Sequence, residues 1–158
     1  MCYPISSFGA HVAARPRTSL KTRGNVAMCG TFGYELDPRK LTDDEKAEVK
    51  QQIADYRKYH CLVREGDFYR LVSPTENDFY CAWEFVSPDK QEAMMTAVVM
   101  RQPETRYCVQ RLRGLDPKTY YQDEETGTVY SGAMLMNAGL NLTRDVYEDG
   151  TSVTKHFK

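Results

Sequence analysis

The stretch Thr22–Leu41, TRGNVAMCGTFGYELDPRKL, carries most of the information about the fold. It is dense in glycine and apolar residues, and no Asp or Glu precedes Glu35 in the chain. The nearly unbroken apolar residues from Val26 to Tyr34 predict a strand buried on both faces, which needs helices packed against it. A chain of 158 residues supplies few such helices. We therefore expect the N-terminal part to be separated from its packing partners.

A helix is predicted directly after this stretch, over Thr42–Tyr59. Thr42 and Glu45 form a capping-box pattern, and Asp43 and Asp44 add negative charge at the positive end of the helix dipole. Apolar residues then recur at helical spacing, which gives the helix one packing face: Val49, Ile53 and Tyr56. We expect this helix to pack rather than to carry chemistry.

From Cys61 onward the hydrophobic pattern changes from helical to strand-like. Short segments rich in aromatic or β-branched residues are predicted as strands: Asp67–Val72, Tyr80–Val86, Glu92–Met100, Tyr107–Leu112, Tyr120–Gln122, Gly127–Tyr130 and Val153–Phe157. Turn-forming residues separate several of them, as at Ser87-Pro88-Asp89. The predicted fold class is mainly β, with a C-terminal antiparallel β-sandwich preceded by one helix.

Composition excludes several classes of partner. A net charge of -1 and a pI near 6.3 argue against nucleic acid or a membrane surface, which usually select a strong basic excess. No apolar run approaches a membrane span of about 20 residues, and the first residues lack a signal-peptide pattern. The cysteines are odd in number and widely spaced, without a Cys-x-x-Cys pair: Cys2, Cys29, Cys61, Cys81 and Cys108. We expect a cytoplasmic protein with no cofactor or metal, and a structural role for His60 beside Cys61.

Trp83 raises a carbohydrate-binding hypothesis, because sugars stack on flat rings, and Tyr80 and Phe85 lie close to it in sequence. Alternation along a strand places Trp83 and Phe85 on one face, and a large aromatic on a sandwich strand usually belongs to the core. We expect the core role and a largely buried Trp83. Tyr120 and Tyr121 are adjacent, so they must point to opposite faces and only one could join a binding surface.

Several blocks of sequence occur in an order typical of one protein family. They are YPISSFGAHVAA, LKTRGNVAMCGTFGYELD, LTDDEKAEVKQQIADYRKY, GDFYRLVSP, AWEFVSPDKQEA, LRGLDP and GTVYSGAMLMNAGL. These blocks resemble the α-galactosidases of glycoside hydrolase family 36, in which a (β/α)₈ barrel is followed by an antiparallel β-sandwich. The resemblance implies that residues 1–60 are a remnant of the C-terminal end of the barrel and that residues 61–158 form the sandwich. It also implies retaining hydrolysis of terminal α-galactosides, such as raffinose-type oligosaccharides or melibiose, by the complete enzyme.

The resemblance assigns no catalytic, substrate-binding or metal-binding residue to this chain. The family's two catalytic carboxylates are aspartates in a Lys-Trp-Asp type strand end and a Ser-Asp-Asn-Thr-Asp type loop, and neither string occurs here. The chain also lacks the Asn-His-Gln-containing insertion that family members usually carry after the equivalent of Pro16. Because that loop would lie near the barrel's active-site face, its shortening suggests a decayed or truncated gene.

Charged residues in the N-terminal part offer no substitute for that pair. Glu35 and Asp37 would share one face of an extended segment, and such carboxylates cannot flank a glycosidic bond from opposite sides. Asp37 also precedes Pro38, which is typical of a turn before a helix. A basic cluster lacks the interleaved aromatics of a nucleic-acid site and is expected to form a loop or salt bridges: Arg15, Arg17, Lys21 and Arg23.

Three interpretations of function stay open. The chain is the C-terminal portion of an α-galactosidase, inactive alone and in contact with α-galactoside only in the full enzyme. Alternatively, it is a non-catalytic β-sandwich module that binds carbohydrate or a protein partner, or the product of a truncated gene. In each case an apolar strand without neighbours must be covered, and we expect a homo-oligomer formed through residues 1–37, or disorder there.

Overall fold

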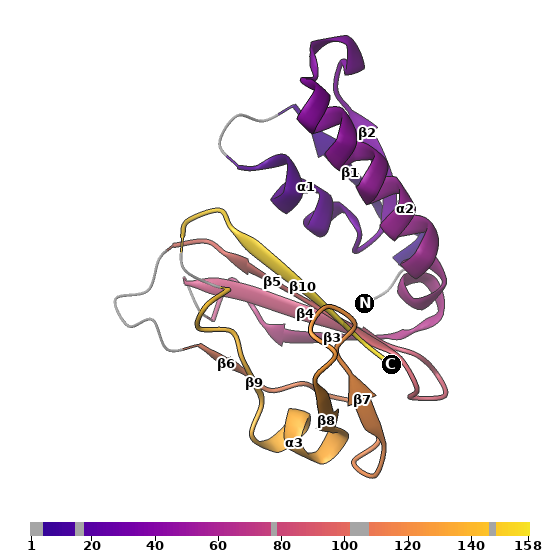
Figure 1. Ribbon diagram of the computed structural model, residues 1–158, viewed down its shortest axis with the longest axis vertical. Coiled ribbons are helices and arrows are strands. Elements are labelled where there is room, and N and C mark those ends of the chain that lie inside the picture. Colours follow the sequence, from indigo (N-terminus) through magenta and orange to yellow (C-terminus); the bar gives the residue numbers. More distant parts are fainter. Residues whose placement is uncertain (1–4, 15–17, 77–78, 102–107, 146–147) are drawn as a thin grey trace.

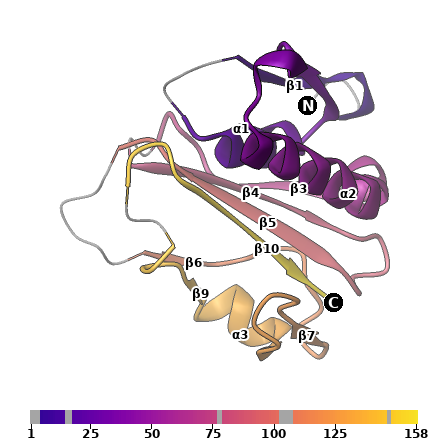
Figure 2. The ribbon, with the colours of Figure 1, turned by 45° about the horizontal axis from the view of Figure 1, so that its top comes forward.

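Three layers are visible in Figure 2: a helical layer from the N-terminal part, a four-stranded sheet in the middle, and a layer of short strands with one helix beneath it. The structure is a computed structural model, and it describes residues 5–14, 18–76, 79–101, 108–145 and 148–158. Both the sheet and the layer beneath it belong to the part of the chain after residue 65.

The helical layer starts with η1 (Ile5–Ser7) and contains two parallel strands, β1 (Gly9–Ala13) and β2 (Thr31–Glu35). Their register runs from Gly9 opposite Thr31 to Ala13 opposite Glu35. Helix α1 (Leu20–Ala27) connects them, because parallel neighbours need a crossover. The result is a small βαβ unit (Figure 1).

The strand expected over Val26–Tyr34 is wrong in its first half. Val26 and Ala27 belong to α1, and the strand begins only at Thr31, with side chains that are partly buried or exposed rather than buried on both faces. The cause is an N-cap. Ser19 Oγ accepts from the Thr22 N–H over 3.1 Å and starts a helix, which the apolar pattern alone does not indicate.

Helix α2 (Asp43–Glu65) follows a short 3-10 turn, η2 (Pro38–Lys40), and it packs on α1 at Gly24. A Cβ on Gly24 would lie 2.4 Å from Cδ of Gln52, so a larger residue there would force the Gln52 side chain to move. The side chain of Gln52 is buried there, and its Nε2 donates to the Leu20 carbonyl over 3.0 Å.

The predicted capping box of α2 is confirmed, but its predicted end is wrong. Glu45 N–H donates to Thr42 Oγ1 over 3.2 Å, and Thr42 N–H donates to the Glu45 carboxylate over 2.9 Å. The helix continues past Tyr59 to Glu65, so the strand-like pattern does not begin at Cys61 and the division expected after residue 60 falls inside a helix. Burial of Leu62 and Val63 against the sheet explains the extension.

The middle layer is an antiparallel sheet in the order β10-β5-β4-β3. Its strands are β3 (Asp67–Val72), β4 (Tyr80–Val86), β5 (Ala93–Val99) and β10 (Ser152–Phe157). The predicted bounds of β3 and β4 are confirmed, and the other two strands differ from prediction by a residue at the ends. The antiparallel, mainly β fold class is therefore confirmed.

The lower layer contains two antiparallel pairs of short strands and a short helix. β6 (Val109–Gln110) pairs with β9 (Leu140–Asn141), and β7 (Tyr120–Gln122) pairs with β8 (Val129–Ser131). The strand expected over Tyr107–Leu112 shrinks to β6, and Tyr107 lies outside the described residues. Helix α3 (Gly132–Asn137) was not predicted, although Ser131 caps it by accepting from the Met134 N–H over 3.1 Å.

The main core lies between the sheet and this lower layer. Its fully buried members come from both sides and include Met95, Phe157, Tyr121, Leu112 and Leu142. A second, smaller core lies on the opposite face of the sheet, where Phe85 and Met94 contact Leu62 and Val63 of α2. Within the described ranges, no helix is long and apolar enough to cross a membrane.

Candidate functional site

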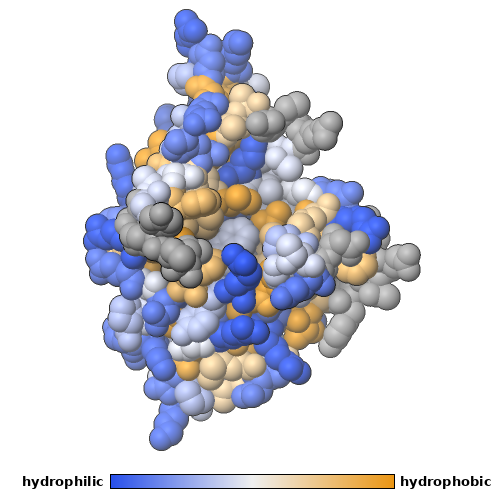
Figure 3. Space-filling view, turned by 180° about the vertical axis from the view of Figure 1, so that it is seen from behind, coloured by the Kyte–Doolittle hydropathy of each residue, from blue (hydrophilic) through white to orange (hydrophobic). Residues whose placement is uncertain are grey.

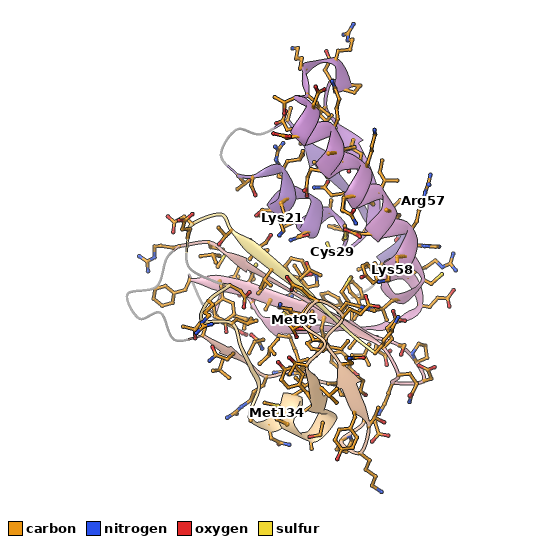
Figure 4. All side chains as sticks on the ribbon, viewed as in Figure 1. Lys21, Cys29, Arg57, Lys58, Met95 and Met134 are labelled. Carbon is orange, nitrogen blue, oxygen red and sulfur yellow. The ribbon has the colours of Figure 1, made fainter. Side chains whose placement is uncertain are left out.

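The candidate site is a cleft of about 610 Å³ between the helical layer and the outer strand β10. Helix α1 and residues of α2 form one wall, and β10 with the segments around residues 124 and 145 forms the other. Figure 4 labels Lys21 on α1 and Lys58 on α2, the two helices above the sheet. The cleft is lined mainly by polar side chains, in two groups.

The first group, the hydroxyl cluster, consists of Ser19, Thr22, Asn25 and Ser152. Asn25 Nδ2 donates to Ser152 Oγ over 2.9 Å, and Ser152 Oγ donates in turn to Thr22 Oγ1 over 3.0 Å. Ser19 Oγ also donates to Thr22 Oγ1, over 3.1 Å. Because Ser152 begins β10 while the other three belong to α1 and its cap, this cluster joins the two layers directly.

The second group, the ionic cluster, is centred on Glu124, which follows β7. Its carboxylate pairs with Lys58 of α2 and, over 2.8 Å, with Lys158 near the C-terminus, and it accepts from the Tyr59 hydroxyl over 3.1 Å. Burial alone would raise the pKa of Glu124, but the bonds from Lys158 and Lys58 and the charge of His156 hold that pKa well below its usual range. Glu124 is therefore ionised and cannot serve as a general acid.

His156 of β10 completes the ionic cluster and is 6% exposed. Its Nε2 lies 2.6 Å from Glu92 Oε1, and its Nδ1 lies 2.9 Å from Glu124 Oε2. The imidazole also lies against the Tyr59 ring, with 4.5 Å between the ring centroids. Beside it, Lys155 pairs with Glu125 and lies 3.8 Å from Asp123. No short sequence pattern predicted this cluster, because its members are far apart along the chain.

Outside the cleft, Glu84 of β4 is a fully buried carboxyl in the face of the sheet that forms the main core. Desolvation raises the pKa of Glu84 to about 8, although the Arg113 N–H donates to its Oε1 and opposes the rise. Its Oε2 has no hydrogen-bond partner among the described residues. Glu84 does not line the cleft, so Glu84 and Glu124 do not form a pair.

The aromatic residues weighed for sugar binding do not form one platform. Trp83 and Phe85 share a face as predicted, but that face is covered by α2: Phe85 is buried and Trp83 is partly buried in the smaller core. Tyr80 lies on the other face, where its hydroxyl donates to Gln110 Oε1 over 3.2 Å. Tyr121 is buried and Tyr120 is 72% exposed, which confirms that the adjacent tyrosines point to opposite faces.

The charged residues singled out in the N-terminal part have structural contacts. Glu35 lies 2.7 Å from His11 Nδ1, which ties β2 to β1, and Asp37 caps η2 and pairs with Arg39 over 3.0 Å. Arg23 donates to the Ala13 carbonyl and so holds α1 to the end of β1. Lys21 lines the cleft, whereas Arg15 and Arg17 lie outside the described residues.

On α2, Cys61 is exposed and His60 is half-buried, with 3.5 Å between His60 Nε2 and Cys61 Sγ. Among the residues that the structure describes, no group of His, Cys, Asp and Glu side chains could hold a metal ion. The cleft is thus a polar joint between two layers. Three carboxylates that line it are bound to cations or to an amide group: Asp55, Glu124 and Glu125.

Comparison with known families identifies the class of protein. Residues 1–66 match the melibiase family, and residues 80–157 match the glycosyl hydrolase family 36 C-terminal domain. The two matches lie on either side of the α2–β3 junction, and they agree with a helical layer followed by an antiparallel sheet. The chain belongs to glycosyl hydrolase family 36 and corresponds to the C-terminal region of its α-galactosidases.

Individual relatives support the same family assignment. The bifunctional α-galactosidase/sucrose kinase AgaSK of Mediterraneibacter gnavus is 44% identical over 89% of this chain, and α-galactosidase AgaA of Geobacillus stearothermophilus is 48% identical over 90%. The galactosidase domain of AgaSK superimposes on 99% of this chain with a TM-score of 0.93 and 40% identity. A variant of AgaA in complex with raffinose superimposes with a TM-score of 0.91 and 44% identity.

The chain spans only a small part of these proteins. It covers 16% of AgaSK and 20% of AgaA in sequence, and 22% of each solved chain. The likeness therefore establishes the family and the fold of this region.

Proposed function

We propose that this chain contributes the C-terminal region of an α-galactosidase and is inactive by itself. The observation that carries the proposal is the superposition of 99% of the chain on the galactosidase domain of AgaSK. That overlap includes the helical layer as well as the sheet, so the chain matches more than a separable sandwich. A retaining glycosidase needs a nucleophile and an acid/base about 5 to 5.5 Å apart, and Glu124 and Glu84 meet neither requirement.

The substrate class follows from the same relatives. Solved structures of AgaA variants contain raffinose and stachyose, which both end in an α-galactoside. We propose that the full enzyme hydrolyses terminal α-galactosides of this kind, including melibiose, with retention of configuration. In this proposal β1, α1, β2 and α2 are the end of its (β/α)₈ barrel, and the sheet with the lower layer is its sandwich domain.

A chimera tests this function. The region of AgaA that corresponds to this chain is replaced by the whole chain, and hydrolysis of a chromogenic α-galactoside is measured beside the chain alone and AgaA without that region. We expect turnover only from the chimera. Turnover by the chain alone, or a folded chimera without activity, would contradict the proposal, and the second result would favour a decayed gene product.

Cytoplasmic location and self-association belong to the same proposal. Four described cysteines are free, which suits a reducing compartment: Cys29, Cys61, Cys81 and Cys108.

Phe8 and Val26 of the helical layer are 57% and 40% exposed, and apolar patches interrupt the polar surface in Figure 3. We expect light scattering to detect oligomers of the whole chain and fewer of a chain that begins near Leu41. A monodisperse monomer of the whole chain would contradict this.

A further inference from the structure

The cleft between the helical layer and β10 has polar side chains on each of its walls. Thr22 and Asn25 lie about one turn apart on α1, and Asp55 of α2 lines the same space. Opposite them, Ser152 and Thr154 alternate along β10 and share one face of that strand. Removing such groups from water is costly, so the layers do not close here as they do at the smaller core. A cleft of about 610 Å³ remains, within the range of about 300 to 1,000 Å³ that is typical of small-molecule sites.

Several polar groups in this cleft have no partner. Lys21 of α1 and Arg144 after β9 are exposed cations, and within the described ranges neither side chain forms an ion pair or a hydrogen bond. The carboxylate of Asp145 likewise accepts no hydrogen bond from the described residues. Asn25 donates one amide hydrogen to Ser152 Oγ over 2.9 Å, which leaves its second N–H and its carbonyl oxygen without a described partner. The cleft therefore presents unused donors and unused acceptors together.

The charges of the lining indicate the class of ligand. Lys21 and Arg144 are matched in number by Asp55 and Asp145, and the carboxylates of the ionic cluster are already bound to lysines. The cleft thus has no excess of positive charge to attract a phosphate or another anion, and its polar lining does not suit an apolar ligand. A saccharide hydroxyl both donates and accepts, so a neutral polyhydroxylated molecule uses donors and acceptors of this kind equally.

The aromatic ring in the cleft does not offer a stacking surface. Tyr59 lines the cleft, but the His156 ring lies against it with 4.5 Å between the centroids. The Lys58 ammonium also lies 4.8 Å from the centroid of the Tyr59 ring. Recognition in this cleft therefore depends on hydrogen bonds, and charge-assisted bonds from the cations and the carboxylate are the strongest of these.

We propose that this cleft is a binding site for a neutral mono- or disaccharide. Lys21 and Arg144 donate to its hydroxyls, Asp145 accepts from them, and the Asn25 amide does both. The site needs neither of the family's catalytic aspartates, so it belongs to this chain alone and does not rest on the proposed hydrolysis. Because α1 and β10 form opposite walls, a bound saccharide also holds the helical layer to the sheet, as any ligand that binds only the folded state stabilises that state.

The first measurement is a titration of the whole chain with melibiose, a neutral disaccharide, followed by saturation-transfer NMR. We expect saturable binding. Inorganic phosphate serves as the probe for an anion site and should not displace the sugar. Absence of saturable melibiose binding would overturn the proposal, and so would displacement of melibiose by phosphate.

The second measurement locates the bound sugar by hydrogen exchange and mass spectrometry of the whole chain with and without melibiose. We expect added protection in peptides from α1 and β10, the two walls of the cleft. The exposed Tyr120 on β7 is the competing surface for a sugar. Added protection confined to β7 and β8, or spread evenly over the chain, would contradict a site in the cleft.

Three substitutions at exposed positions provide the contrast. Lys21→Ala and Arg144→Ala should each weaken melibiose binding by about tenfold, the size of losing one hydrogen bond from a charged group. The matched control is Arg57→Ala, which removes an exposed cation that Figure 4 shows on the outer side of α2 and that does not line the cleft. Circular dichroism checks that all three variants fold. Equal affinity in the two cleft variants and the control would overturn the proposal.

Discussion

The two faces of the four-stranded sheet are stabilised by different kinds of contact. The face toward α3 and the short strand pairs buries apolar side chains almost completely, as at Met95, Ala97 and Phe157. The face toward α1 and α2 has a small apolar core near Phe85, and beside it hydroxyl, histidine and ion-pair contacts. The first face is stabilised by burial of apolar area, whereas the second is stabilised by hydrogen bonds and ion pairs between polar groups. We therefore expect the sheet and its lower layer to be the stable unit and the helical layer to be the more easily released one.

The largest effect is expected on the apolar face. Phe157→Ala removes a fully buried ring that packs near Tyr130, and it should lower the free energy of unfolding by about 3 to 5 kcal/mol, as other buried aromatic truncations do. Urea denaturation checks this. A loss below about 1 kcal/mol would mean that the lower layer is loosely packed.

Glu84 is the exception on that face, and its effect should depend on pH. The pKa of Glu84 is raised from 4.5 to about 8 in the folded chain, so the folded state binds its proton more tightly than the unfolded state. Stability is then highest below the unfolded value and falls as pH rises from about 4.5 to 8. Glu84→Gln should remove this fall and stabilise the chain by about 2 to 4 kcal/mol at pH 8.5.

The matched control for Glu84 is Glu65→Gln, at an exposed carboxylate at the end of α2. It should change stability by less than about 0.5 kcal/mol at any pH, as surface substitutions do. Equal pH profiles for the two variants in thermal melts would contradict a raised pKa of Glu84 in the folded chain.

Trp83 tests the apolar part of the helix-facing side. Because Trp83 is partly exposed, Trp83→Ala should cost about 2 kcal/mol, less than the 3 to 5 kcal/mol of a fully buried aromatic. In the unaltered chain, its fluorescence should be poorly quenched by iodide. Free quenching with unchanged stability would instead support a sugar-binding surface.

The smallest effect is expected in the hydroxyl cluster. Ser152→Ala removes the donor to Thr22 and the acceptor of Asn25, and should cost about 1 kcal/mol. The control is Ser87→Ala, which alters a serine in the turn after β4. Thermal melts of both variants compare the stability lost at the joint between the layers with the stability lost in a local turn. The exchange rates of α1 amides should rise only in Ser152→Ala.

Local patterns predicted much of the fold. Alternation and turn residues around Asp67–Val72 and Tyr80–Val86 gave strands with the observed bounds, and Thr42 with Glu45 placed the start of α2. The errors arose where distant contacts override a local pattern. Leu62 and Val63 extend α2 because the sheet covers them, and α1 replaces part of a strand because Ser19 caps it.

The candidate site could not be predicted in this way. His156 is separated by 64 residues from Glu92, and Ser152 by 130 from Thr22, so no short window contains either contact. The alternation within Val153–Phe157 does place His156 on the face opposite Phe157, which is the one local hint. The resemblance identified the family, but it assigned no residue of this chain to the joint.

The difference between the two faces is tested most directly by hydrogen exchange of the whole chain at increasing urea concentrations, followed by mass spectrometry. We predict that peptides from β1, α1, β2 and the first part of α2 lose protection at lower urea than peptides from β4 and β5. One shared urea dependence for all of these peptides would contradict the account, because the layers would then unfold as a single unit.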